Sequence, residues 1–237
     1  MSTTSSKTTP RALDSLRERK RQRTRDALVD TALRLFQECG FAETTLDEVC
    51  AQAEVSKRTF FRYFASKEDV VLASCHELWL AFQSEVESLT PARGTVFETL
   101  QEALLVALEK RASPRWAERH AVAWQLAETA PSITAHNLGF CDRVSDGSWR
   151  TLCARFGLTG PDDLRARLAQ DLLVAAFHRA EEQWAKQTGP KTLSELRSRL
   201  REALDAASHA TTCTGVLNAG VPTGYAPSNG VLSDWVR

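Results

Sequence analysis

Two short helical patterns separated by a turn occupy residues 44–67, which read TTLDEVCAQAEVSKRTFFRYFASK. In the first pattern, Thr45 stands three residues before Glu48. This is the spacing of a capping box, in which each side chain bonds to the other residue's backbone amide. In the second pattern, Ser56 is placed to cap a helix over residues 57–64. The stretch therefore predicts a helix-turn-helix, because two short helices joined by a tight turn define that unit.

The second of these predicted helices has a basic face and an aromatic face. Between Ser56 and Lys67 there are four basic residues and no acidic ones. Phe60 and Phe64 stand four residues apart and therefore share a face, which we expect to be buried. A helix with an apolar back and a cationic, hydrogen-bonding front suits the major groove of DNA. We interpret it as a recognition helix.

Helical patterning continues over the rest of the chain. Apolar residues recur three and four positions apart, and glycine or proline separates the stretches. No segment alternates polar and apolar residues as a strand does, so the predicted fold class is all-α. Besides the two short helices, we expect helices over residues 16–39, 66–89, 95–112, 114–129, 132–155, 162–187 and 191–210.

Charge is distributed unevenly along a chain whose net charge is zero. Residues 1–25 contain eight basic and two acidic side chains, which gives this segment a charge of +6 and leaves −6 on the remainder. A net charge of zero by itself argues against a nucleic-acid partner. A basic arm on a mildly acidic body favours such a partner, because the local distribution of charge matters more than its sum. A solvated leader without a partner is the alternative interpretation.

The sequence lacks the motifs of common catalytic and metal sites. It has no Gly-rich phosphate loop, no G-x-S-x-G and no H-E-x-x-H, and none of its six cysteines form a C-x-x-C pair. We expect neither enzyme activity nor a cofactor or metal. A redox-sensing role for one of the cysteines is left as an alternative. A helical enzyme whose groups meet only in space, or a helical scaffold without DNA binding, is the alternative.

No membrane segment is predicted. No apolar run approaches the ~20 residues that cross a bilayer, and the first residues lack the apolar stretch of a secretory signal. We expect a cytoplasmic protein without a membrane partner.

Over residues 20–72, about a quarter of the chain, the sequence resembles the DNA-binding domain of TetR-type (tetracycline-repressor-like) regulators. The segments that carry the resemblance are Ala32-Leu33-Arg34-Leu35-Phe36, Gly40-Phe41, Thr44-Thr45-Leu46-Asp47-Glu48-Val49, Val55-Ser56-Lys57-Arg58-Thr59-Phe60-Phe61-Arg62-Tyr63-Phe64 and Ser66-Lys67-Glu68-Asp69-Val70-Val71. Two positions depart from the family pattern. Phe61 stands where tyrosine is usual, and Glu54 stands where the turn commonly has glycine.

The resemblance implies DNA contacts from the helix-turn-helix. Lys57 and Arg58 are expected at base edges, and Lys67 at a phosphate. The remaining expected contacts lie along the DNA backbone and come from Thr45, Thr59, Phe61 and Tyr63. Phe61 has no hydroxyl, so it is expected to pack on sugar or on the protein core.

The resemblance also implies how the chain is divided. We expect a disordered leader over residues 1–15, the DNA-binding domain over 16–65, a helical ligand-binding and dimerisation domain over 66–210, and an irregular tail over 211–237. The implied function is a homodimeric repressor that leaves a palindromic double-stranded operator when a small apolar or aromatic effector binds.

Two sets of residues in the larger domain follow from this expectation. The expected dimer interface, a four-helix bundle, uses Leu168, Leu172, Ala175, Leu196, Leu200 and Leu204. Packing of these residues inside one subunit is the alternative. The expected ligand pocket uses Trp79, Phe82, Trp124, Phe140, Phe177 and His178. Ordinary core packing is the alternative for these aromatic residues.

Overall fold

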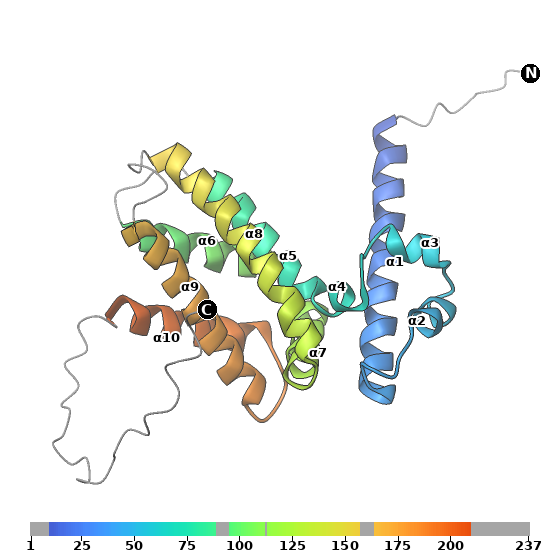
Figure 1. Ribbon diagram of the computed structural model, residues 1–237. Coiled ribbons are helices and arrows are strands. Elements are labelled where there is room, and N and C mark those ends of the chain that lie inside the picture. The colour runs from blue at the N-terminus through green and yellow to red at the C-terminus, as the bar shows by residue number, and fades with distance from the viewer. Residues whose placement is uncertain (1–9, 89–94, 112, 157–163, 210–237) are drawn as a thin grey trace, which may run out of the picture.

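The computed structural model describes residues 10–88, 95–111, 113–156 and 164–209 (Figure 1). All regular elements within these ranges are helices, which confirms the predicted all-α class. The helices are α1 (Pro10–Cys39), α2 (Leu46–Gln52), α3 (Lys57–Phe61), α4 (Lys67–Val71), α5 (Ala73–Ser88), α6 (Val96–Lys110), α7 (Pro114–Thr129), α8 (Pro131–Phe156), α9 (Leu164–Lys186) and α10 (Leu193–His209).

The amino-terminal unit is built on the long helix α1. Helices α2 and α4 pack against α1, and α2 also packs against α3. Phe36, Val49 and Phe60 are each at most 2% exposed and belong to one hydrophobic cluster. In Figure 1 the amino-terminal half of α1 extends past α3. This helix begins at Pro10, earlier than the predicted residue 16. Proline is well suited to the first turn of a helix, where its missing N–H has no partner to lose.

The body consists of α5 to α10. Helix α5 packs against α6 and α8, and α9 pairs closely with α10 (Figure 1). The two units meet where α1 packs on α7 and where α4 packs on α8. The predicted leader falls partly, and the predicted tail wholly, on residues outside those described. The domain boundaries therefore stay predictions.

The predicted capping box at the start of α2 is present. The Thr45 N–H donates to Glu48 Oε2 at 2.7 Å, and the Glu48 N–H donates to Thr45 Oγ1 at 3.2 Å. The hydrogen bond from the Thr45 backbone holds the pKa of the Glu48 carboxyl below its ordinary value. Two orphan amides of the helix start are thereby satisfied, which fixes where α2 begins.

Besides α1, two predicted helices differ clearly from those observed. Helix α3 ends at Phe61 rather than at residue 64, and the helix predicted over 66–89 is divided into α4 and α5. Between them Leu72 has φ −81° and ψ 4°, away from the helical value of ψ. The division lets α4 pack on α1 while α5 enters the body.

The turn between α2 and α3 contains a strained residue. Glu54 has φ +53°, a left-handed conformation that favours glycine. The Val55 N–H donates to the Cys50 carbonyl at 2.9 Å and closes the turn around it. The turn thus tolerates the glutamate at the family's usual glycine position at a conformational cost.

Replacing Glu54 with glycine is expected to stabilise the protein by about 0.5–1 kcal/mol, because glycine adopts this backbone without a Cβ clash. Urea unfolding measures the change. Glu54→Ala is the matched control: it also removes the carboxylate but keeps the Cβ, so it should change the free energy of unfolding little. Equal effects of both variants would show that the charge, not the backbone, matters at this position.

Candidate functional site

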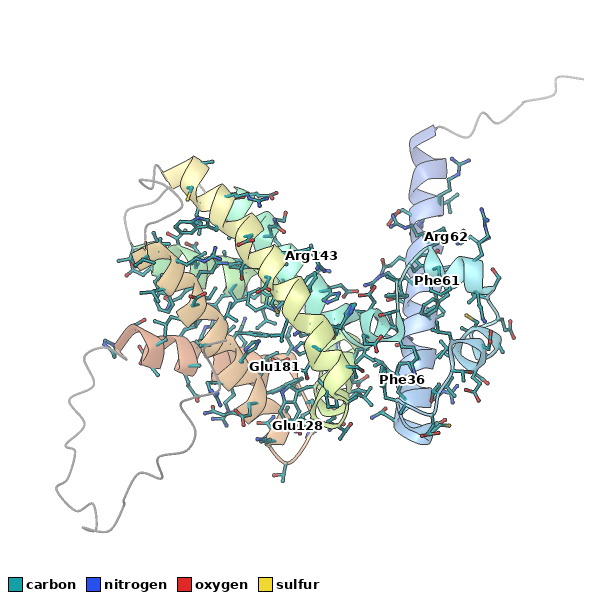
Figure 2. The ribbon with its side chains drawn as sticks, in the orientation of Figure 1. Phe36, Phe61, Arg62, Glu128, Arg143 and Glu181 are labelled. Carbon is teal, nitrogen blue, oxygen red and sulfur yellow. The ribbon has the colours of Figure 1, made fainter. Side chains whose placement is uncertain are left out.

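Helix α3 presents its basic residues to solvent over an aromatic back. Lys57 and Arg58 are exposed, whereas Phe60 is 1% exposed and packs in the core. Phe61 is 53% exposed, with its ring edge-on to Phe60 at 5.5 Å between centroids. Figure 2 shows Phe61 and Arg62 at α3, away from the body. Phe61 is therefore available to an outside partner rather than used in the core.

Lys57 is held by a neighbour on α2. Its Nζ lies 2.9 Å from Asp47 Oδ1, and the hydrogen bond to Asp47 keeps the pKa of the Lys57 ammonium above its ordinary value. Both side chains are more than half exposed. The ion pair orients Lys57 across the gap between α2 and α3, and Lys57 has to exchange this partner to bind an anion.

The hydroxyl residues of the predicted interface serve local structure. Thr45 is exposed and caps α2, as described above. Thr59 is half-buried, with its Oγ1 3.0 Å from the Oγ of Ser56, the α3 cap. Tyr63 is half-buried, and its ring lies under the Arg62 guanidinium at 5.1 Å. Thr45 therefore lies at the start of α2, Thr59 within α3, and Tyr63 just after α3.

Lys67 organises the loop before α2. Its Nζ donates to the carbonyl oxygens of Phe41 and Thr44, each at 2.9 Å, and lies 4.6 Å from the Phe41 ring centroid. Gly40 opens this loop with φ +92°, as expected of a glycine that ends a helix. An ammonium has three N–H donors, so one donor remains for another acceptor while two hold the loop.

The aromatic residues predicted for the ligand pocket divide into two groups. Trp79 and Phe82 on α5 and Phe177 on α9 form one buried cluster, with ring centroids 5.5 Å and 5.2 Å from Trp79. The others lie elsewhere. Phe140 stacks on His76 at 3.7 Å, Trp124 is half-buried beside Lys186, and His178 is exposed. The structure thus assembles half of the predicted set.

A buried polar cluster centred on His120 lies next to this core, at a residue that the sequence marks as either pocket polarity or helix surface. His120 is 1% exposed, and its Nδ1 lies 3.2 Å from Ser74 Oγ and its Nε2 lies 2.8 Å from Glu181 Oε1. It joins α5, α7 and α9. The sequence places His120, Trp124 and Glu128 at four-residue spacing on α7, but the structure buries only the first of them. Figure 2 shows Glu181 inside the body and Glu128 at its edge.

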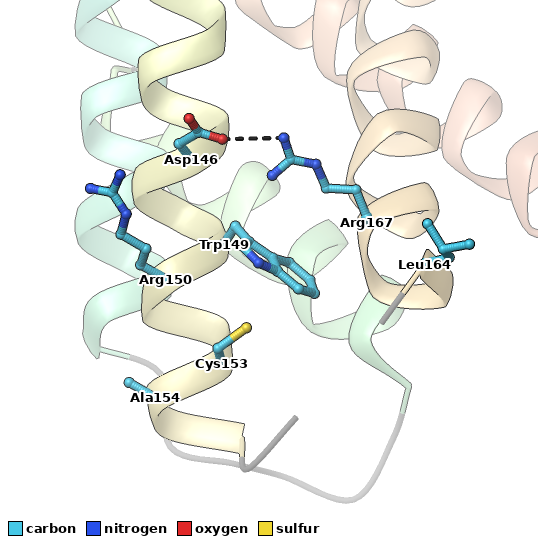
Figure 3. A pocket seen from close by; sticks show the side chains of 7 residues that line it. All are labelled: Asp146, Trp149, Arg150, Cys153, Ala154, Leu164 and Arg167. Carbon is cyan, nitrogen blue, oxygen red and sulfur yellow. Dashed lines mark hydrogen bonds and ion pairs between the residues drawn. The ribbon is translucent and has the colours of Figure 1, made fainter. Parts of the chain in front are cut away.

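A cleft of about 1020 Å³ opens between α8 and α9 (Figure 3). Trp149 and Cys153 on α8 and Leu164 on α9 line it. An ion pair between Asp146 on α8 and Arg167 on α9, with 3.2 Å between Oδ1 and Nη2, spans it. Its charged mouth and aromatic wall give it the features of an entrance for an organic molecule.

The residues predicted for the dimer interface lie on two different surfaces. Leu196, Leu200 and Leu204 of α10 are at most 4% exposed within one subunit. For these residues the structure matches the alternative of packing within the subunit. On α9, Leu168 is 62% exposed, Ala175 is exposed and Leu172 is half-buried. A groove of about 420 Å³ continues this surface between Leu172, Ala175, Ala203 and Ala207.

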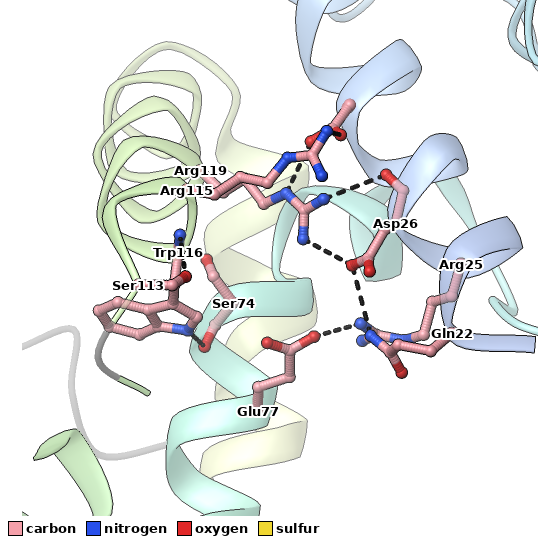
Figure 4. Close-up of polar contacts among 10 residues, drawn as sticks. Gln22, Arg25, Asp26, Ser74, Glu77, Ser113, Arg115, Trp116 and Arg119 are labelled. Carbon is pink, nitrogen blue, oxygen red and sulfur yellow. Dashed lines mark hydrogen bonds and ion pairs between the residues drawn. The ribbon is translucent and has the colours of Figure 1, made fainter. Parts of the chain in front are cut away.

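A network of ion pairs joins the amino-terminal unit to the body (Figure 4). Arg119 of α7 donates to Asp30 Oδ1 at 2.7 Å, to Asp26 Oδ1 at 2.8 Å and to the Asp26 carbonyl at 3.2 Å. Arg115 pairs with Asp30 at 2.6 Å, and Arg25 pairs with Glu77. Burial alone would lower the pKa of Arg119, but the bonds to Asp30 and Asp26 outweigh it and raise the pKa.

A second junction links α4 to α8. His136 Nε2 lies 2.6 Å from Asp69 Oδ1, and the Ala65 N–H donates to Asp69 Oδ2 at 2.8 Å. Burial alone would raise the pKa of Asp69, but these two hydrogen bonds outweigh it and hold the pKa below its ordinary value. Beside it, burial lowers the pKa of His76 to about 4.

His76 is expected to make stability depend on pH. The proton binds less well in the folded state, so the unfolded chain binds more protons between the unperturbed pKa of about 6.5 and the folded pKa of about 4. Its contribution is complete above this window and is lost as the pH falls through it, by about 2–3 kcal/mol. His76→Phe keeps a ring on Phe140, and urea unfolding across this window should show a flatter pH profile. An unchanged profile would assign the dependence to other groups.

Among the described residues, no helix is both long enough and apolar enough to cross a membrane. Within the same residues, no group of three or more His, Cys, Asp or Glu side chains is placed to hold a metal ion.

The chain matches one protein-family model and two known regulators. Residues 28–74 match the family model described as bacterial regulatory proteins, tetR family. The HTH-type transcriptional regulator TcmR of Streptomyces glaucescens is 31% identical over 186 residues, which cover 77% of this chain and 81% of TcmR. The HTH-type transcriptional regulator YerO of Bacillus subtilis strain 168 is 37% identical over 51 residues, which cover 22% of this chain and 18% of YerO.

Solved structures resemble the chain more distantly. A TetR-family transcriptional regulator from Mesorhizobium loti matches with a TM-score of 0.47 and 19% identity, over 81% of this chain and 97% of that one. Thermus thermophilus FadR, a TetR-family repressor solved with lauroyl-CoA, matches with a TM-score of 0.46 and 23% identity, over 78% of this chain and 93% of that one.

Proposed function

Because the chain belongs to the tetR family of bacterial regulatory proteins, DNA-binding regulators of transcription, we propose that it is a homodimeric repressor of a palindromic operator. In this proposal a small apolar or aromatic ligand in the body releases the operator. The observation that carries the proposal is the exposed Lys57–Arg58 start of α3 above the buried Phe60. These are the residue types that read guanine in the major groove.

The DNA contacts proposed are those gathered around α3. Lys57 and Arg58 are assigned to base edges, and Phe61 to sugars or thymine methyl groups, because its ring is exposed and apolar. Backbone contacts are assigned to Thr45, Thr59, Tyr63 and Lys67. Most of the affinity is expected to come from phosphates, with a slope of about −0.9 in log K against log salt for each phosphate neutralised.

The dimer is proposed because one helix-turn-helix covers too few base pairs for specificity. Two recognition helices about 34 Å apart would read two half-sites. The exposed apolar face of α9, with Leu168, Leu172 and Ala175, and the neighbouring Ala203 and Ala207 of α10 are the proposed interface. The buried leucines of α10 support this surface from inside.

Binding to DNA upstream of the protein's own gene tests the proposal. Fluorescence anisotropy and footprinting should show two protomers on a two-fold symmetric site, with half-site centres about one helical turn apart. A minimal site without a repeat, bound by one protomer, would contradict the dimer. Failure to bind any DNA above the level of a scrambled duplex would contradict the regulator itself.

Lys67→Met is expected to weaken binding to operator and scrambled duplexes by the same factor, about tenfold for the dimer. The variant removes a phosphate ligand, and it also frees the loop held by the carbonyls of Phe41 and Thr44. Anisotropy titrations on both duplexes measure the factor. A loss confined to the operator would instead assign Lys67 to base recognition.

A further inference from the structure

Six buried side-chain polar atoms lack a hydrogen-bond partner among the described residues, and three of the six lie at positions 79, 148 and 170 on α5, α8 and α9. These three are Trp79 Nε1, Ser148 Oγ and Gln170 Oε1, on residues that are 4%, 0% and 2% exposed. The Cys75 thiol lies near Trp79 Nε1, and a neutral thiol is a weak acceptor. Buried polar groups in native proteins are nearly always paired. Two of these residues, Trp79 and Gln170, line one cavity, which makes that cavity a candidate binding site.

Trp79 and Gln170 line the same small cavity. It lies between α5, α8 and α9, has a volume of about 10 Å³, and is otherwise walled mainly by Phe82, Val144 and Leu173. Ser148 stands one helical turn beyond Val144, on the same side of α8. This space is roughly that of one water molecule. A larger molecule would have to displace the walls to reach Trp79 Nε1 and Gln170 Oε1.

The acceptor of Gln170 has a fixed orientation. Its Nε2 donates to the Ser145 carbonyl at 3.0 Å. A carbonyl accepts only from the nitrogen of an amide, so the other end of the side chain, Oε1, must be the one that lacks a partner. The cavity thus offers one donor at Trp79 and one acceptor at Gln170.

The open cleft between α8 and α9 adjoins this cavity along the same two helices. Asp146 of the cleft follows Ser145 of the cavity on α8, and Arg167 of the cleft stands one turn before Gln170 on α9. Figure 3 shows the Asp146–Arg167 pair across the space between the helices. A molecule held in the cleft would reach the cavity by parting this exposed ion pair, which contributes little to stability.

The cavity is suited to an uncharged molecule. None of its wall residues is acidic or basic, and burial raises the pKa of the Cys141 thiol, which stays neutral. An ion placed there would lose its hydration without gaining a counter-charge. Trp79 and Phe82 supply aromatic surface.

We propose that the effector is a neutral aromatic molecule with a carbonyl oxygen that accepts from Trp79 Nε1 and a hydroxyl that donates to Gln170 Oε1. The inference rests on the proposed function, because it gives the chemistry of the ligand expected in the body. It also assigns Gln170 to the site, beyond the aromatic residues expected from the sequence.

Four benzophenone-type probes test the chemistry on the unaltered protein by isothermal titration calorimetry in mildly acidic buffer. They are 4-hydroxybenzophenone, benzophenone without the hydroxyl, diphenylmethane without either polar group, and the charged 4-benzoylbenzoate. Affinity should fall about five- to tenfold with each polar group removed, and the carboxylate should bind weakest. Equal affinities, tighter binding of the carboxylate, or no binding by any probe would overturn the inference.

Variants assign the two hydrogen bonds. Trp79→Phe should weaken both neutral ketones about five- to tenfold and leave diphenylmethane unchanged, and Gln170→Leu should weaken only 4-hydroxybenzophenone. Trp124→Phe is the matched control, because that half-buried indole lies outside the cavity walls. A loss of all three neutral probes to the same extent in Trp79→Phe would overturn the assigned hydrogen bond.

The same titrations separate this inference from the proposed function. Operator affinity is measured with and without 4-hydroxybenzophenone. The predicted ranking of probes with unchanged operator affinity would contradict release by ligand and leave the chemistry of the site standing. Specific operator binding without any probe binding would contradict only the chemistry.

Discussion

Replacing Arg58 with alanine is expected to weaken operator binding by a dimer between about 30-fold and about 10⁴-fold. A bidentate contact between arginine and guanine contributes about 1–3 kcal/mol of discrimination, and a two-fold complex loses two of them. Arg58 is exposed on the first turn of α3, so its loss removes no core packing. Anisotropy titrations on operator and scrambled duplexes at the same salt concentration measure the loss.

The scrambled duplex identifies the role of Arg58. Affinity for it should fall only by the cost of one fewer positive charge per protomer, because non-specific binding depends on phosphates. Arg34→Ala is the matched control, since Arg34 is an exposed arginine of the same unit that pairs with Glu38 on α1. Arg34→Ala should weaken binding to the two duplexes by the same small factor. If Arg58→Ala also weakened both duplexes by one factor, Arg58 would be a phosphate contact rather than a base contact.

Asp47 competes with DNA for the ammonium group of Lys57, the residue next to Arg58. The ion pair between Asp47 and Lys57 is exposed, so its net contribution to stability is small. In the proposed complex with DNA, a phosphate or a guanine edge replaces the Asp47 carboxylate as the partner of Lys57. The neighbouring Asp47 then faces the negatively charged DNA, which lowers affinity for every sequence and leaves discrimination to the base contacts.

Local signals in the sequence were sufficient for most of the helices. Thr45 and Glu48 form the predicted capping box, and the predicted helices from residue 95 onward match α6 to α10 to within three residues at each end. Caps, glycines and prolines act on neighbouring residues, so a single sequence displays them. The division at Leu72 has no such signal, because it depends on α4 and α5 packing on different partners.

Contacts between distant residues could not be predicted in the same way. Periodicity showed that Leu196, Leu200 and Leu204 share a face of α10, but not whether that face meets its own subunit or a second one. It likewise grouped aromatic residues by type, so His178 joined Trp79 although it is exposed. The orphaned Gln170 Oε1 had no sequence signal at all, because its lack of a partner depends on three helices meeting.

Arg119→Ala is expected to lower the free energy of unfolding by about 2 kcal/mol. The Arg119 side chain is 12% exposed, and its loss leaves Asp26 and Asp30 partly buried without their main counter-charge. Complete burial would make the cost about 3–5 kcal/mol, but the two carboxylates are 28% and 33% exposed, so solvent screening reduces it. Urea unfolding measures the loss.

The position of Arg119 also makes it a link between the body and the amino-terminal unit. It follows Glu118 and precedes His120 on α7, and His120 reaches α5 and α9 inside the body. A movement of α7 would therefore shift Asp26 and Asp30, and with them α1 and the helices packed on it. Operator affinity should fall in Arg119→Ala even though no DNA contact is removed, because the spacing of the two recognition helices is held less firmly.

A double-mutant cycle distinguishes this link from an ordinary surface charge. Arg115 and Arg119 lie on the same helix and pair with the same carboxylate, Asp30, at 2.6 Å and 2.7 Å. Arg115 is 66% exposed, so its coupling to Asp30 should be below about 0.5 kcal/mol, whereas the less exposed Arg119 should couple by about 1–2 kcal/mol. Two double-mutant cycles, each combining Asp30→Asn with one of the arginine variants, measure the two coupling energies by urea unfolding. Similar couplings would mean that burial does not strengthen the junction, and the loss of operator affinity would then require another cause.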